Sequence, residues 1–108
     1  MARGLNRGEI WMYTFKQPDK RRPVLVISRQ RSLDVMSTAI VVPITTTMRG
    51  TPMEVSLGIE DGLKIASSAN VANIESVPQT RLFKFVGVAR PEKMIEVCRA
   101  LAIASGCD

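Results

Sequence analysis

The sequence predicts a mainly β domain in which a small, barrel-like antiparallel sheet carries one C-terminal helix. Short apolar segments, separated by turn residues, fill residues 9–89, as is typical of a sheet with several strands. Residues 91–104 are the clearest helix, because they place apolar side chains at helical spacing. The 108 residues suit one domain, and an aromatic content of 5% predicts a core of aliphatic side chains.

The first part of the chain predicts two strands around a basic loop. Residues 1–6 are expected to be a flexible tail, and residues 7–108 a single domain. Residues 9–15 combine β-branched and aromatic side chains, which predicts a strand. Residues 16–22 are polar and end in three consecutive cations, so we expect a loop. Residues 23–28 are apolar and predict a buried strand, which a proline can open because the first residue need not donate to the ladder.

The middle of the chain predicts the central strand of the sheet. Residues 29–34 are expected to be a connection, and residues 38–46 the central strand. Pro43 interrupts that strand and indicates a bulge or an edge. Residues 53–57 alternate roughly and predict another strand between two glycine-containing turns. Residues 64–76 are compatible with a helix or a strand on pattern alone.

The last part of the chain predicts two strands and the helix. Residues 71–77 alternate apolar and polar side chains, which favours a strand. Pro78 is expected to start one helical turn, and residues 82–89 predict a further strand. The helix of residues 91–104 begins with a proline and ends before Gly106. Its apolar face is expected to contain Met94, Val97, Cys98 and Leu101.

The charge of the chain favours a polyanionic partner. The formal net charge is +5. Residues 1–52 contain nine Lys and Arg against three Asp and Glu, whereas residues 53–108 contain six against seven. A basic half is typical of nucleic-acid binding, although a solvated basic surface without function gives the same count.

The sequence also predicts a cytoplasmic protein that does not associate with membranes. No apolar stretch approaches the length that crosses a bilayer, and the N-terminus lacks the apolar core of a signal peptide. Cys98 and Cys107 match no zinc or redox motif. Two unpatterned thiols agree with a reducing compartment.

The absence of histidine restricts the chemistry of any active site. Ser-His-Asp, Cys-His and paired-imidazole sites are excluded. No glycine-rich phosphate loop occurs, and no closely spaced carboxylates indicate a two-metal centre. We therefore expect neither a metal ion nor a cofactor, and any catalysis must use Arg, Lys, Thr, Ser, Asp, Glu or Tyr.

RNA cleavage is compatible with this inventory because RNA carries its own nucleophile, the 2′-hydroxyl. A protein can assist by positioning the substrate and by stabilising developing negative charge. The arginine fork matches phosphate oxygens, and a threonine hydroxyl adds a hydrogen bond. Arg22, at the end of the basic loop, and Thr45, at the end of the third strand, are the natural candidates. In most proteins, however, two such residues are an ordinary surface cation and an ordinary strand residue.

Four segments resemble the MazF/PemK family of toxins and occur in the same order. Residues 7–11 (RGEIW) resemble the opening RG(E/D)(I/V)(W/Y), and residues 22–28 (RPVLVIS) the strand RPV(V/L)V(I/V)S. Residues 39–46 (AIVVPITT) resemble the strand (I/V)VVP(I/L)T(S/T). Residues 73–77, then Arg81-Leu82 and Gly87, follow the spacing of QIRTID…RL…G. The resemblance covers residues 7–105.

The resemblance implies an SH3-like barrel of the CcdB/MazF type, a homodimer, and metal-independent cleavage of single-stranded RNA at short sequences. Cleavage would leave a 2′,3′-cyclic phosphate and a 5′-hydroxyl, and would inhibit translation and growth. An acidic cognate antitoxin would block the RNA groove. The family's active-site arginine falls on Arg22 and its threonine on Thr45, so Arg22 would stabilise the phosphorane and Thr45 would hold a non-bridging oxygen.

The chain departs from the family pattern near the candidate base. Some relatives carry an acidic base where this chain has Ala72, and Asn73 and Glu75 replace the Gln and Arg of QIRT. The base is therefore unassigned, and the cleavage sequence is expected to differ from that of better-known members. The residues expected to contact RNA, each otherwise an exposed polar residue, are Lys16, Gln17, Lys20, Arg21, Thr46, Thr47, Arg49 and Asn73.

Two other functions are compatible with the sequence. A non-enzymatic toxin resembling CcdB would bind and poison DNA gyrase, but CcdB-like proteins end in a tryptophan-bearing helix tail. The only tryptophan here is Trp11, near the other terminus. A catalytically silent RNA- or protein-binding barrel is the second alternative, because the acidic residue of the family is missing.

Overall fold

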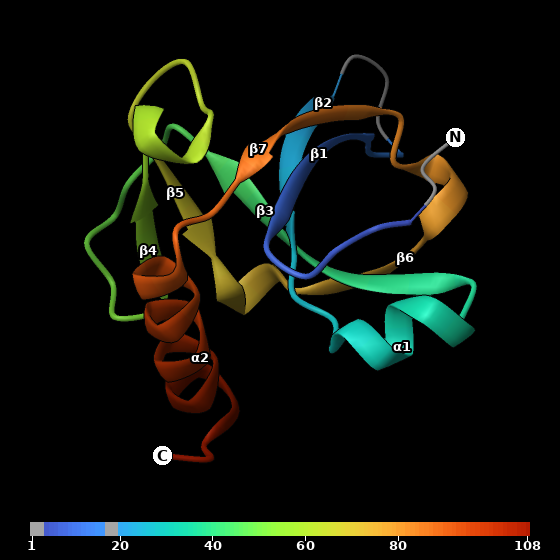
Figure 1. The fold of residues 1–108 in the computed structure, drawn as a ribbon. Helices are drawn as coiled ribbons and strands as arrows, with labels where there is room; N and C mark the ends of the chain where they lie inside the picture. The colour runs from blue at the N-terminus through green and yellow to red at the C-terminus, as the bar shows by residue number, and fades with distance from the viewer. Residues whose placement is uncertain (1–3, 17–19) are drawn as a thin grey trace.

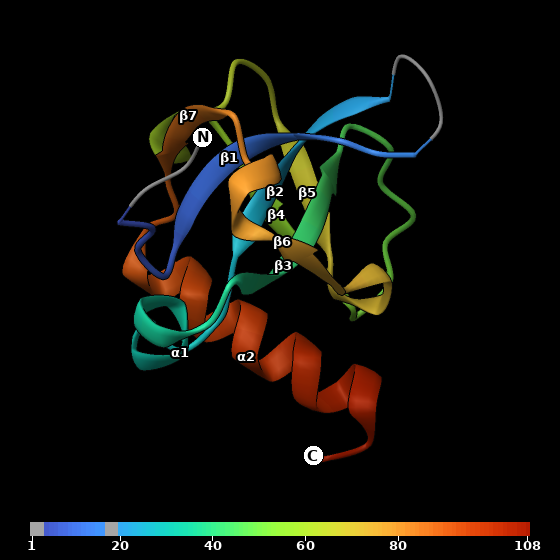
Figure 2. The ribbon, with the colours of Figure 1, turned by 90° about the vertical axis from the view of Figure 1, so that its right-hand side faces the viewer.

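The computed structural model describes residues 4–16 and 20–108, which form a curled antiparallel sheet with a long C-terminal helix (Figures 1 and 2). Paired strands follow the order β4-β5-β3-β2-β1-β7, and β6 pairs with β3 beside this path. The curled sheet is a half-barrel, so the predicted fold class is confirmed. The strands are β1 (Glu9–Thr14), β2 (Arg21–Val26), β3 (Thr38–Thr45), β4 (Glu54–Leu57), β5 (Ser67–Asn70), β6 (Glu75–Pro78) and β7 (Lys84–Val88). The helices are α1 (Gln30–Val35), α2 (Pro91–Ser105) and the 3₁₀ turns η1 (Ile59–Asp61), η2 (Val71–Asn73) and η3 (Gln79–Arg81).

The central strand β3 changes its outer neighbour halfway along. Its first half pairs with β6 as far as Val41, and its last residues pair with β5 from Ile44. On the other side β3 stays in continuous register with β2, so the predicted bulge at Pro43 is wrong. The amide of Ile27 bonds to the carbonyl of Ile40, so by alternation residue 43 faces away from β2, toward the gap between β6 and β5. Proline fits there because no donor is needed, and the strand is locally an edge.

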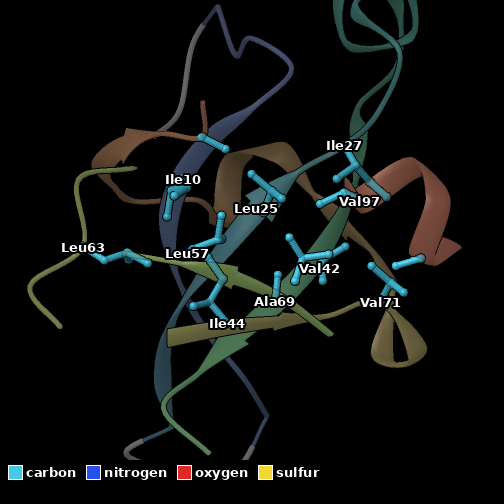
Figure 3. Close-up of a cluster of buried hydrophobic side chains, with 13 residues drawn as sticks. Ile10, Leu25, Ile27, Val42, Ile44, Leu57, Leu63, Ala69, Val71 and Val97 are labelled. Atoms are coloured by element: carbon cyan, nitrogen blue, oxygen red, sulfur yellow. The ribbon is translucent and has the colours of Figure 1, made fainter. Parts of the chain in front are cut away.

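The two faces of the sheet bury separate apolar clusters. One cluster contains Leu25, Val42 and Ile44 of the central strands and is covered by Val97 and Ala100 of α2 (Figure 3). The other contains Val24, Val26 and Val41, which alternate with the first set along β2 and β3. Partly buried Trp11, Tyr13 and Phe15 of β1 and its extension pack against this second cluster. Aliphatic side chains dominate both clusters, as the composition predicts.

The described start of the chain, from residue 4 onward, is part of the folded domain. Leu5, predicted to lie in a flexible tail, is only 2% exposed and belongs to the second cluster. The Gln30 side chain donates to the Leu5 carbonyl at 2.9 Å and accepts the Arg7 amide at 2.8 Å. These contacts lie at the start of α1, in a segment predicted to be an irregular connection. Arg29 provides no side-chain cap, so long-range contacts and burial of Leu33 stabilise the helix.

Two element boundaries and the burial of one helix residue also differ from the prediction. β2 begins at Arg21, so Arg21 and Arg22 belong to the strand rather than to the loop. Residues 71–77, predicted as one strand, divide into η2 and β6 because the Asn70 side chain accepts the Ala72 amide at 3.0 Å and ends β5. Cys98 is exposed and does not join the buried face of α2. The predicted helical turn after Pro78 is confirmed as η3, and α2 ends at Gly106 with φ of 76°.

A close backbone crossing joins η1 to β7. The Asp61 side chain is fully buried and accepts hydrogen bonds from the amides of Gly58 and Arg90, both at 2.9 Å, and from the Arg90 Nε at 3.2 Å. A Cβ atom at Gly87 would lie 2.3 Å from the Asp61 carbonyl oxygen and 2.8 Å from the Cα of Gly62. Glycine at position 87 therefore permits the contact between these segments.

Replacing Gly87 with alanine is expected to lower the free energy of unfolding by about 2–3 kcal/mol, because the added methyl group meets backbone that cannot move aside. Urea unfolding at one fixed protein concentration measures the change. Val88→Ala, at an exposed position of the same strand, serves as the control and should change it by about 0.5 kcal/mol or less. Equal effects of the two substitutions would contradict the close crossing.

The charge of Asp61 is expected to stabilise the fold only above acidic pH. Burial alone raises the pKa of Asp61, but hydrogen bonds from Arg90 and the Gly58 amide outweigh burial and lower it below its ordinary value. A lowered folded-state pKa gives stability that is present above the unfolded pKa of about 3.9 and is lost as the pH falls through the folded value. Asp61→Asn should therefore cost about 2 kcal/mol at pH 7.

Urea unfolding between pH 2 and pH 7 tests this linkage. The difference between the wild-type protein and Asp61→Asn should begin to shrink below about pH 4, where Asp61 takes up a proton in the unfolded chain, and should be smallest once the pH is below the lowered pKa of folded Asp61. A difference that stays constant down to pH 2 would show that the carboxylate charge contributes nothing.

Candidate functional site

A basic groove of about 760 Å³ opens beside the gap in the pairing of β3. One wall comes from β1, from β2 and from the described residues of the loop between them. The other wall comes from the segment between β5 and β6. Its described lining residues are Tyr13, Phe15, Lys16, Lys20, Arg22, Pro43, Ala72, Asn73, Ile74 and Glu75. Three of these side chains are cations and one is a carboxylate, so the groove suits an anionic ligand.

Strand register explains why these side chains share one groove. Tyr13 lies opposite Arg22, and the next residue of β2 on the same face, Val24, lies opposite Pro43. Opposed residues of antiparallel strands project from the same face of the sheet. Glu75 opens β6 on the outer side of β3. The groove thus collects one face of four strands at the point where β3 lacks an outer partner.

Arg22 is half-buried, and no described residue engages its guanidinium. Among the described residues it forms no hydrogen bond and no ion pair, whereas Arg90 is bonded to Asp61 and Arg7 donates to the Ile27 carbonyl. Tyr13, opposite Arg22, packs edge-on against Phe15 with ring centroids 4.9 Å apart. The aromatic pair lies beside Arg22 along the groove and leaves its donors available to a phosphate.

Thr45 projects from the same face as Arg22. Continuing the β2–β3 register by two residues beyond Val24 and Pro43 brings Arg22 opposite Thr45. Thr45 is half-buried, and its Oγ1 accepts the Thr47 amide at 3.1 Å, so its hydroxyl proton is free to point outward. On its other side it pairs with Ser68, whose buried Oγ has no hydrogen-bond partner within the described ranges.

The residues predicted to bind RNA are divided by the structure. Lys16, Lys20 and Asn73 line the groove with Arg22, and Gln17 lies outside the described residues. Arg21 and Thr46 line a second depression of about 540 Å³ on the opposite face, beside Phe83, Phe85, Lys64 and Lys84. Thr47 and Arg49 are exposed in the loop after β3 and line neither cavity.

The loop that carries Arg49 is held by a carboxylate. Glu54 accepts the amides of Arg49 and Thr51 at 3.1 Å and of Gly50 at 2.8 Å. Burial alone raises the pKa of Glu54, but these amide hydrogen bonds outweigh burial and lower it below its ordinary value. The loop is therefore ordered by an ionised Glu54 at neutral pH. In Figure 2 this loop and η2 lie on the same side of the molecule as the ends of β1 and β2 that flank the groove.

Six lining residues were not predicted as site residues: Tyr13, Phe15, Pro43, Ala72, Ile74 and Glu75. Tyr13 and Phe15 are two positions apart, so strand alternation puts them on one face of the sheet. Once the pairing of β1 with β2 was known, this alternation could have placed both side chains on the face of Arg22. Glu75 and Ile74 carry no local signal, because their position depends on the turn of η2. Within the described residues no group of three His, Cys, Asp or Glu side chains could hold a metal ion.

None of the helices in the described ranges is long and apolar enough to cross a membrane.

The comparisons agree on one family. Residues 6–105 match the model of the PemK-like, MazF-like toxins of type II toxin–antitoxin systems. The chain is 35% identical over 103 residues to the probable endoribonuclease MazF5 of Mycobacterium tuberculosis, covering 94% of each protein.

Two solved structures have the same fold. The Mycobacterium tuberculosis toxin MazF-mt6 superposes with a TM-score of 0.84 at 28% identity, over 93% of this chain and 98% of that one. A mycobacterial endoribonuclease in complex with its cognate antitoxin superposes with a TM-score of 0.85 at 27% identity, over 96% and 97%. The chain therefore belongs to the PemK-like, MazF-like toxin family of type II toxin–antitoxin systems.

Proposed function

We propose that this chain is an endoribonuclease toxin that cleaves single-stranded RNA and thereby inhibits translation and growth. The observation that supports this most directly is the guanidinium of Arg22, which no described residue engages and which lies in a groove with Lys16 and Lys20 and on the same face as Thr45. The relatives named as endoribonucleases support the reaction class. Neither gyrase poisoning nor a catalytically silent barrel has comparable support.

The proposed reaction uses the 2′-hydroxyl of the substrate as nucleophile. Its oxygen attacks the adjacent phosphorus, the bond from phosphorus to the 5′-oxygen breaks, and the products are a 2′,3′-cyclic phosphate and a 5′-hydroxyl. Arg22 binds the non-bridging oxygens as negative charge develops on them, and Thr45 donates a hydrogen bond to one of them. Because the nucleophile is internal and the groove supplies the positive charge, the reaction needs no metal ion.

RNA binding is proposed to extend from the groove over the neighbouring loops. Lys16 and Lys20 contact phosphates at one end, and Asn73 reads a base edge at the other, with Gln17 nearby in the sequence. Thr46, Thr47 and Arg49 follow Thr45 in the loop that Glu54 holds through hydrogen bonds, and they are proposed to contact RNA there. Arg21 lines the second depression on the opposite face, and we propose that it contacts RNA that continues beyond the groove.

The proposed partners follow from the family and from the charge. A homodimer and an acidic antitoxin are expected, and one structural relative is held by its cognate antitoxin. An acidic chain can compete with RNA for a basic groove because both present negative charge to the same cations. The proposed substrate makes the cytoplasm the site of action.

Replacing Arg22 with alanine is expected to lower the cleavage rate by about 10³-fold, because the developing charge on the phosphorane then lacks its guanidinium. The measurement is fragment release from a long single-stranded RNA in EDTA, with the fragment ends analysed for cyclic phosphate. Arg99→Ala removes an exposed cation from α2, away from the groove, and is the matched control.

Arg99→Ala should cleave like the wild-type protein. Uncut RNA with the wild-type protein, or an Arg22→Ala variant that cleaves at the wild-type rate, would refute the proposed role of the groove. If EDTA abolished RNA cleavage by the wild-type protein, the proposal of a metal-independent reaction would be refuted.

Replacing Thr45 with valine is expected to lower the rate by about 10²-fold, since one hydrogen bond to the phosphorane is lost while the side-chain volume is retained. Thr45→Ser keeps the hydroxyl and should stay within about fivefold of the wild-type rate. Single-turnover cleavage of one short RNA compares the three proteins. A serine variant as slow as the valine variant would indicate a packing role for Thr45.

A further inference from the structure

One charged side chain of the groove has no role in the proposed reaction. Glu75, the first residue of β6, is the one carboxylate among the described residues that line the groove. It is exposed, and within the described ranges no hydrogen bond or ion pair engages it. By contrast, the carboxylates of Glu54 and Asp61 are occupied by backbone amides, and that of Asp61 also by Arg90. An unengaged carboxylate among cations is free to interact with a ligand.

The reaction requires a base that the other described side chains lining the groove do not supply. The 2′-hydroxyl is a weak nucleophile until its proton is removed. At neutral pH lysine, arginine and tyrosine side chains normally carry their protons, and only a carboxylate is normally in its basic form. Within the described part of the chain, the ionisable side chains that line the groove are those of Lys16, Lys20, Arg22, Tyr13 and Glu75, and Glu75 is therefore the one of these suited to accept the proton.

The strand register places Glu75 and Arg22 on two sides of a gap. Glu75 lies opposite Val41 on one side of β3, and Val26 lies opposite Val41 on the other. Arg22 is four residues from Val26 along β2, so its Cα is roughly 10 Å across the sheet and 13 Å along the strand from that of Glu75. Both side chains line the same groove, which leaves space between them for one phosphodiester and its ribose.

We propose that Glu75 is the general base of the cleavage reaction, an assignment that rests on the proposed function. As the 2′-oxygen forms its bond to phosphorus, its proton passes to the Glu75 carboxylate. The bond to the 5′-oxygen breaks, and that oxygen takes a proton from water. The protonated Glu75 then returns its proton to solvent. Arg22 and Thr45 hold the phosphate while Glu75 contacts the 2′-hydroxyl, so the positive charge of Arg22 and the negative charge of Glu75 act on different atoms of one linkage.

The experiment compares Glu75→Gln with the wild-type protein in single-turnover cleavage of a short RNA. Glu75→Gln retains the size and the hydrogen-bonding capacity of the side chain but cannot take the proton. Glu60→Gln removes an exposed carboxylate outside the groove and is the matched control. Affinity is measured separately, with the same RNA carrying a 2′-deoxy nucleotide at the cleavage site.

Glu75→Gln is expected to cleave about 10²- to 10³-fold more slowly and to bind the 2′-deoxy RNA within about twofold of the wild-type affinity. The wild-type rate should rise with pH over the acidic range, and this rise should be absent in Glu75→Gln. Adding formate should restore part of the rate to Glu75→Ala, because a diffusible carboxylate replaces the missing base. Glu75→Asp should fall between the wild-type protein and Glu75→Gln.

The outcomes separate this proposal from the proposed function. If the wild-type protein and Glu60→Gln cleave RNA while Glu75→Gln cleaves within threefold of them, the base is another group and the nuclease remains. If Glu75→Gln loses affinity in proportion to rate and formate restores nothing, Glu75 contacts RNA without acting as base. If the wild-type protein leaves RNA intact, both proposals fail.

Discussion

The exchange of partners along β3 is the constraint on which the site depends. β3 keeps one continuous neighbour, β2, but passes from β6 to β5 between Val41 and Ile44. A strand left unpaired for two residues normally exposes a donor, and Pro43 removes that donor. The gap is thereby stable without a further strand, and the segment from Ala72 to Glu75 lines it instead. The groove is a consequence of how the sheet satisfies its backbone hydrogen bonds.

Cations of this chain divide into those that hold the fold and those that remain available. Arg90 is bound to the buried Asp61, Arg7 to the Ile27 carbonyl, and Arg81 stacks over Tyr13 with its guanidinium carbon 5.8 Å from the ring centroid. Arg22 and Lys20 have no such engagement among the described residues. A net charge alone therefore overstates the surface that can bind RNA, and hydrogen-bond partners decide which cations bind a ligand.

Local pattern predicted most of the fold, and long-range pairing determined the rest. The strands β1 to β4 and β7 and the helix α2 follow from alternation, turn residues and the Pro91–Gly106 boundaries. Helix α1 and the burial of Leu5 depend on contacts between them through Gln30, which no local window contains. Arg22 and Thr45 were identifiable from chemistry and resemblance, whereas Glu75 enters the groove only because η2 turns the chain after Asn70.

The two faces of the sheet contribute differently to the stability of the fold. This difference explains why the groove can contain charged side chains that no described residue engages. On the face with Leu25 and Val42, α2 and the Asp61–Arg90 contact close the core with buried hydrogen bonds. The other face ends, beyond Val24 and Pro43, in residues that are half-buried or exposed, so a charge there remains solvated and costs little. Binding a phosphodiester would remove that water, and each charge would then act at lower dielectric. Groups that contribute little to folding can in this way contribute strongly to a reaction, because their interactions are completed only by the substrate.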